Sequence, residues 1–193
     1  MRKAEVKRQS LESNVRVLIN LDGTGKAKIK TGIGFFDHML SLLAFHAKLD
    51  LEVEASGDLY VDDHHTVEDI GIVFGQALKE ALGDRKGIAR YGSFLLPMDE
   101  VLARAVLDIS GRSTLVFRVK FTNERIGELA TEMIKEFFLA VVNQAGLTLH
   151  LEVFYGENNH HIAEAIYKAF GRTLQQAFKL EGTEIPSSKG LLD

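Results

Sequence analysis

The feature that most constrains the fold is an internal repeat at an offset of 96 residues. A His-His-x-x-Glu segment occurs twice: His64, His65 and Glu68 in the first half recur as His160, His161 and Glu164 in the second. The residues that follow repeat at the same offset: Ile70, Phe74, Gly75, Leu78 and Ala81 recur as Ile166, Phe170, Gly171, Leu174 and Ala177. Because identical apolar spacing on two helices requires similar buried faces, the chain is expected to contain two halves of one architecture.

The order of predicted elements also repeats. Apolar–polar alternation predicts strands over 15–21, 26–30 and 49–55, and helical spacing predicts helices over 36–48 and 64–82. The second half repeats this order with strands over 100–109, 114–121 and 147–154 and helices over 128–144 and 160–178. The residues expected to cap the two repeated helices are Asp62, Asp63, Asn158 and Asn159. We therefore predict an α+β fold of two duplicated halves, 1–88 and 89–193, in one globular unit. Each half has about four strands and two helices, and the helices are packed between two sheets.

The composition excludes several classes of protein. The chain of 193 residues has no cysteine, which excludes disulfides, thiolate metal sites and thiol nucleophiles, and favours a reducing cytoplasm. A net charge of -4 gives no reason to expect nucleic acid or a membrane as a partner. Residues 1–10 are basic but no apolar run follows them, so no signal peptide is expected. The apolar stretches are also far shorter than the ~20 residues of a membrane span.

The repeated His-His-x-x-Glu segment predicts a metal site. Adjacent histidines on a helix point about 100° apart, so each helix can offer ligands to two ions. Glu68 can share a face with either histidine before it, and we expect the pair with His65, one turn away, to bind metal. His161 and Glu164 would form the second pair. A donor set of imidazole and carboxylate without thiolate suits manganese, iron or zinc. A single His-His pair is commonly a solvated helix start, but two copies with the same spacing favour metal binding.

Two further ligands are expected from the helices that precede each pair. His38 follows Phe35-Phe36-Asp37 at a predicted helix start, and Glu136 takes the corresponding place in the second half. His46 and His150 have no counterpart at the repeat offset, so we expect half-buried, hydrogen-bonded side chains rather than ligands.

A third group of residues could hold an anion. The candidates are Arg90, Arg112, Lys168, Ser187, Ser188 and Lys189. Arg112 follows a glycine in a predicted turn, where a guanidinium can bind an anion through two hydrogen bonds. The hydroxyl groups and ammonium group of residues 187–189 also suit a phosphate, although composition alone does not indicate one.

Several segments together resemble the imidazoleglycerol-phosphate dehydratase family. The resemblance rests on Phe36-Asp37-His38-Met39-Leu40, Asp63-His64-His65-Thr66-Val67-Glu68-Asp69 and Asn159-His160-His161-x-x-Glu164-Ala165. Arg8 to Glu12 resembles the family's Arg-x-Thr-x-Glu, with Ser10 in place of Thr, and Ile185 to Gly190 resembles its C-terminal phosphate-binding tail. These segments span nearly the whole chain in the family's order.

This resemblance implies a ribosomal protein S5 domain 2-like fold and a hydro-lyase of histidine biosynthesis. Such an enzyme eliminates water from D-erythro-imidazoleglycerol phosphate to give imidazole acetol phosphate. It would use two Mn²⁺ ions: one held by His38, His65, Glu68 and His160, and the other by His64, His161, Glu164 and Glu136, where many relatives have His. It further implies a cytoplasmic homo-oligomer of 24 subunits whose active sites are shared between subunits.

The resemblance also suggests catalytic roles. Glu12 would be the general acid/base, with Glu68 or Glu164 contributing from the metal shell. The substrate would be bound by Glu12 and the anion candidates, which are Arg90, Arg112, Lys168, Ser187, Ser188 and Lys189.

Three alternatives remain open from the residues. One is a dimetal hydrolase that activates water, the second is a metal-storage protein, and the third is a structural shell in which metals only join subunits. The presence of Glu12, both arginines and the Ser-Ser-Lys tail in one chain favours the dehydratase.

Overall fold

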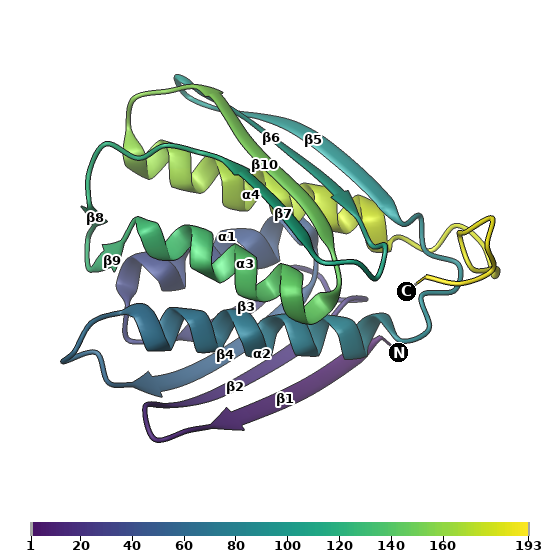
Figure 1. Cartoon of the computed structure of the whole chain (residues 1–193), viewed down its shortest axis with the longest axis horizontal. Coiled ribbons are helices and arrows are strands. Elements are labelled where there is room, and N and C mark those ends of the chain that lie inside the picture. The colour runs from purple at the N-terminus through teal and green to yellow at the C-terminus, as the bar shows by residue number, and fades with distance from the viewer. Residues whose placement is uncertain (1, 193) are drawn as a thin grey trace.

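The computed structural model describes residues 2–192 and has two four-stranded sheets that enclose four long helices (Figure 1). Its elements are β1 (Lys3–Gln9), β2 (Ser13–Asn20), β3 (Ala27–Lys30), α1 (Gly34–Ala47), β4 (Asp50–Gly57), α2 (His64–Leu82), β5 (Tyr91–Met98), β6 (Val101–Asp108), β7 (Thr114–Arg118), β8 (Arg125–Ile126), β9 (Leu129–Ala130), α3 (Glu132–Ala145), β10 (Thr148–Tyr155) and α4 (Asn159–Phe178). Residues 1 and 193, which begin the first predicted half and end the second, lie outside the described residues.

The two large sheets have the same topology. The first has the strand order β1-β2-β4-β3 and the second β5-β6-β10-β7. In each sheet the first three strands are antiparallel, and the fourth runs parallel to its neighbour. The predicted α+β fold with helices between two sheets is confirmed, and equal strand order is what a duplication produces. The boundary at 88/89 stays a prediction.

The helices pair across the two halves. α2 packs against α3 and α1 against α4, while α2 and α4 also cover the inner faces of the first and second sheets. A cluster of fully buried aromatic side chains fills the space between them: Phe36, Phe74, Phe137, Phe138, Tyr167 and Phe170. Gly171 of α4 lies so close to α1 that an added Cβ would be 2.8 Å from the carbonyl oxygen of Leu43. The pairing of α1 with α4 brings their N-terminal halves, which carry the candidate ligands, side by side.

Sequence patterns missed the strands β1 and β5, which form one edge of each sheet. In β1 only Ala4 and Val6 are half-buried among exposed or partly exposed charged residues, so the apolar pattern is weak. Helix α3 begins at Glu132 and not at 128, because residues 125–130 form the short hairpin β8–β9.

The prediction that Asp63 caps α2 is wrong. Its Oδ2 accepts a hydrogen bond from the backbone N–H of Ala130 (2.6 Å), so it holds the hairpin instead. Asp62 accepts from the N–H of His64 (2.8 Å). The cap at Asn158 is confirmed, since its side chain accepts from the N–H groups of His160 and His161. Asn159 does not cap α4, because it bonds to Thr122 through its side-chain oxygen and nitrogen.

Within residues 2–192, no helix combines the length and the apolar character needed to cross a membrane.

Candidate metal centre

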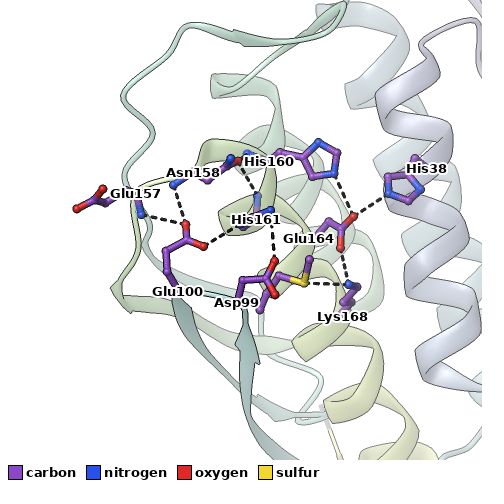
Figure 2. Close-up of polar contacts among 10 residues, drawn as sticks. His38, Asp99, Glu100, Glu157, Asn158, His160, His161, Glu164 and Lys168 are labelled. Atoms are coloured by element: carbon purple, nitrogen blue, oxygen red, sulfur yellow. Dashed lines mark hydrogen bonds and ion pairs between the residues drawn. The ribbon is translucent and has the colours of Figure 1, made fainter.

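Three predicted ligands converge where α1 meets the first turns of α4 (Figure 2). Glu164 Oε1 lies 2.9 Å from His38 Nε2 and 3.1 Å from His160 Nε2. One ligand atom from each residue lies within 4.8 Å of the others. The two imidazoles are about half exposed, with 45% and 46% of the side chain accessible, whereas Glu164 is only 10% accessible. The group therefore has a buried carboxylate at its base and two imidazoles open to an incoming ion.

The charge of Glu164 is fixed by its neighbours. Burial disfavours the charged form, but hydrogen bonds from Lys168, His38 and His160 together outweigh burial and lower the pKa of Glu164 to about 2. Lys168 bonds to Oε2, the second oxygen of the same carboxylate. Glu164 is therefore ionised at neutral pH, as a metal ligand must be.

A second, more open pair lies at the start of α2. His64 Nε2 is 3.7 Å from Glu68 Oε2, and both side chains are about half exposed. Glu136 is half-buried on α3. Within the described part of the chain, these residues do not complete a second group of three ligands.

His65 and His161 are oriented by other carboxylates. His65 Nδ1 lies 3.0 Å from Asp58 Oδ2, and His161 Nδ1 lies 2.8 Å from Glu100 Oε2. Hydrogen bonds to Asp58 and Glu100 raise the pKa values of His65 and His161, respectively. Neither histidine is paired with the Glu three residues after it in its own helix, Glu68 or Glu164.

Within a single chain, the histidine that each glutamate approaches is therefore not the one we expected. Both glutamates approach the histidine four residues before them, His64 and His160, and not the one three residues before. Residues four apart are rotated by about 40° around a helix, against about 60° for residues three apart. Glu164 also lies with His38, although the expected grouping assigned these two residues to different ions.

Glu12 lies in the turn between β1 and β2, near the start of α2. Its Oε1 is 3.8 Å from His65 Nε2. The turn is held by buried Asp69 of α2, which accepts hydrogen bonds from Arg8 Nε (2.9 Å) and from the hydroxyl of Ser13. The packing of the first sheet on α2 thus brings this carboxylate to the repeated His pair.

The anion candidates are divided between two ends of the molecule. Lys168 lies at the candidate metal centre, but Arg90 donates to Asp108 (2.7 Å) and to the carbonyl of Pro186 (2.9 Å) at the far end of α4. The backbone N–H of Arg90 bonds to Ala177, whereas His160 is in the first turn of the helix. At 1.5 Å per residue these positions are roughly 25 Å apart.

The remaining anion candidates are also outside the metal centre. The tail with Ser187, Ser188 and Lys189 lies beyond the C-terminal end of α4 (Figure 1). Arg112 is exposed in the turn between β6 and β7. One chain therefore does not bring these side chains to the histidines.

Sequence reasoning missed Asp58, Asp99 and Glu100. Asp99 Oδ2 lies 3.6 Å from His161 Nε2 and so takes a place like that of Glu12 beside His65. The acidic Asp99-Glu100 pair in a turn was a usable signal, but strand β5 had not been recognised, so the turn could not be placed.

His46 is half-buried as expected, whereas His150 is exposed on β10, so the expectation for His150 is wrong. Burial, followed by the charges of Lys168, Arg172 and Lys48, lowers the pKa of His46. This corner beside Lys168 is therefore cationic.

Comparison with known proteins gives consistent results. A family model described as imidazoleglycerol-phosphate dehydratase matches residues 31–174. A protein of that name from Azorhizobium caulinodans is 58% identical over 195 residues, covering 100% of this chain and 99% of the relative. One from Clostridioides difficile is 54% identical over 192 residues and covers 100% of both.

Two solved structures have the same fold. The imidazoleglycerol-phosphate dehydratase from Staphylococcus aureus subsp. aureus N315 superimposes with a TM-score of 0.84 at 45% identity, over 92% of this chain and 99% of that one. The Pyrococcus furiosus structure, in complex with (S)-C348, has a TM-score of 0.84 at 34% identity, over 97% and 100%.

Proposed function

The chain belongs to the imidazoleglycerol-phosphate dehydratase family, and from this premise we propose that it eliminates water from D-erythro-imidazoleglycerol phosphate, giving imidazole acetol phosphate in histidine biosynthesis. The observation that carries the proposal, beside the similarity over the full length, is the convergence of His38, His160 and Glu164. With no cysteine in the chain and a biosynthetic role, we expect the protein in the cytoplasm.

We propose that the protein binds two Mn²⁺ ions per active site. The donor set fits, because an ionised carboxylate and two imidazole nitrogens converge, and no thiolate is available that would favour a softer metal. His38, His160 and Glu164 would hold one ion. The remaining candidates, for the second ion and for the open positions of the first, are His64, His65, Glu68, Glu136 and His161. When bound, the ions supply Lewis acidity that draws electron density from the imidazole of the substrate.

The protein's own part in the reaction is to move protons. The carbon-bound proton must go to a base, and the hydroxyl group must leave with a proton as water. Glu12 is our candidate for this acid/base role, because the bonds of Asp69 to Arg8 and Ser13 fix its turn beside His65 while its own carboxylate is 55% exposed. Glu68 and Glu164 are candidates for a contribution from the metal shell.

We also propose that each active site is shared between copies of the chain. Lys168 can bind an anion beside the metal centre, but Arg90 and the Ser187–Lys189 tail are roughly 25 Å away along α4. A substrate bound by the histidines of one copy could contact the tail and Arg112 only if the tail and Arg112 belonged to another copy of the chain. This favours a homo-oligomer, for which the family resemblance implies 24 subunits.

The proposal is tested by removing and restoring the metal. We would strip the protein with a chelator, add Mn²⁺, and measure turnover of imidazoleglycerol phosphate and particle size in the same samples. Activity that disappears with the metal and returns with Mn²⁺ is the expected result. A protein that binds Mn²⁺ and assembles but never dehydrates this substrate would exclude the dehydratase function.

The role of Glu12 has a separate test. The Glu12→Gln variant should bind Mn²⁺ normally but lose kcat by about 10²–10⁴-fold, the usual contribution of a general acid or base. Glu157→Gln is the matched control, since the Glu157 side chain is exposed and only the backbone N–H of this residue donates a hydrogen bond, to Glu100. Full kcat in Glu12→Gln would remove Glu12 from the mechanism.

A further inference from the structure

We propose that Asp58 and Glu100 are positioning residues that select one tautomer of His65 and His161, so that each histidine presents Nε2 as its metal-binding atom. This inference rests on the proposed metal-dependent function. It assigns a role to two carboxylates outside the His-His-x-x-Glu repeat.

The geometry is the same at both histidines. Asp58 Oδ2 lies 3.0 Å from Nδ1 of His65, and Glu100 Oε2 lies 2.8 Å from Nδ1 of His161 (Figure 2 shows the second). A neutral imidazole has a single N–H, and a carboxylate can only accept a hydrogen bond. The proton is therefore held on Nδ1, and the lone pair stays on Nε2. Metal-bound histidines commonly have such a carboxylate behind them.

The two carboxylates come from unrelated positions of the fold. Asp58 follows β4 in the loop before α2, whereas Glu100 lies in the turn between β5 and β6. The repeat at the 96-residue offset does not relate them, yet both meet the same ring atom of repeat-related histidines. Within residues 2–192, the other three candidate histidines, His38, His64 and His160, approach carboxylates through Nε2 and not through Nδ1. The same carboxylate–Nδ1 contact therefore arises from two different parts of the fold, which favours the view that these two imidazole rings must be oriented.

The two carboxylates differ in what else they bind. Glu100 Oε1 accepts the N–H groups of Asn158 (2.9 Å) and Glu157 (3.4 Å), which leaves Oε2 for His161. The side chain of Asp58 is 14% exposed, and its Oδ1 is buried without a hydrogen-bond partner.

This difference gives the two amide variants opposite outcomes. In Glu100→Gln, the amide oxygen must stay on the two backbone N–H groups, so the amide NH₂ faces Nδ1 of His161. The ring must then accept at Nδ1 and carry its proton on Nε2, which blocks metal binding there. In Asp58→Asn, the amide oxygen can face His65 while the NH₂ takes the unpartnered position of Oδ1, so the tautomer is kept.

The experiment measures Mn²⁺ affinity of the assembled, metal-stripped protein by competition with a chelator, and records the visible absorption of the Co²⁺ form. We expect Glu100→Gln and Asp58→Ala to weaken Mn²⁺ binding by about 10–100-fold, the usual cost of losing such a partner, and to alter the Co²⁺ spectrum. Asp58→Asn should weaken binding much less than Asp58→Ala. Glu157→Gln, a neighbouring carboxylate that contacts no histidine, is the control.

The proposal is overturned if Glu100→Gln and Asp58→Ala bind Mn²⁺ as tightly as Glu157→Gln. It is also overturned if Asp58→Asn is as weak as Asp58→Ala, because then charge rather than tautomer decides. Should Glu100→Gln fail to fold, as judged by circular dichroism, the comparison of the two Asp58 variants still decides. A wild-type protein that binds no Mn²⁺ would overturn the proposed function itself, which separates the two failures.

Discussion

The contact between α1 and α4 at Gly171 leaves no room for a larger side chain. In Gly171→Ala, the new Cβ would lie 2.8 Å from the carbonyl oxygen of Leu43, 3.1 Å from the backbone nitrogen of Ala47 and 3.1 Å from Cβ of His46. Two of these atoms belong to the backbone and cannot rotate away, so the helices must separate by a few tenths of an ångström.

The size of the effect follows from two opposing terms. Overpacking of a core usually costs about 1–3 kcal/mol, while replacing a helical glycine by alanine stabilises by about 1 kcal/mol. Because the closest contact is with backbone, we take the upper part of the first range and expect a net loss of about 2 kcal/mol. For a chain of this length, that corresponds to a decrease of roughly 4–8 °C in Tm.

The assay is thermal and denaturant unfolding of the metal-free protein at one fixed concentration, because assembly makes stability concentration-dependent. Gly34→Ala is the matched control: it also lies in a helix, but its added Cβ would meet no atom within 4 Å. The control should be neutral or slightly stabilised. If Gly171→Ala is as stable as Gly34→Ala, the two helices are not in limiting contact and the reasoning is refuted.

Three further predictions concern the carboxylates and the core. The folded-state pKa of Glu164, about 2, is below its ordinary value of 4.5, so its contribution to stability is full above about pH 4.5 and is lost as the pH falls towards 2. Glu164→Gln should therefore lose less stability than the wild type between pH 5 and pH 3 in metal-free unfolding experiments, and equal losses would contradict this. Asp69→Asn should loosen the turn that carries Glu12, because Asp69 accepts hydrogen bonds from Arg8 and Ser13. Steady-state kinetics should show kcat lowered about tenfold, with Mn²⁺ affinity unchanged. An unchanged kcat would exclude the anchoring role of Asp69. Phe138→Ala should cost about 3–5 kcal/mol in denaturant unfolding, since the ring is fully buried against other aromatic rings, and a loss below 1 kcal/mol would show that the core can collapse into the cavity.

The repeated helices could be predicted from sequence because their signals are local and strong. The spacing from Ile70 to Ala81 and from Ile166 to Ala177 fixes a buried face, and the observed helices α2 and α4 end as predicted at Leu82 and Phe178. Strands β1 and β5 were missed because an edge strand has neighbours on one side only, and β1 therefore tolerates charged residues that weaken the alternation.

The candidate site could be predicted only as a set of residue types. The two His-His pairs, Glu164 and His38 were identifiable from motif and position, but their pairing depends on how α1 packs against α4. Asp63 illustrates the same limit: its place before a helix predicts a cap, but Ala130, 67 residues later, supplies a better-placed donor. Asp58 and Glu100 are recognisable only after the loop and the turn that carry them have been placed.

The two ends of α4 contribute to different parts of the proposed active site. His160 lies at the N-terminal end, and Arg90 and the tail lie beside the C-terminal end. A substitution at one end would therefore inactivate the metal-binding part of each shared site, and a substitution at the other end would inactivate its anion-binding part. Two inactive variants, one lacking His160 and one lacking Arg90, should therefore restore activity when they are co-assembled, since some sites receive an intact half from each parent. In genetic terms, certain pairs of null alleles of this one gene should complement each other.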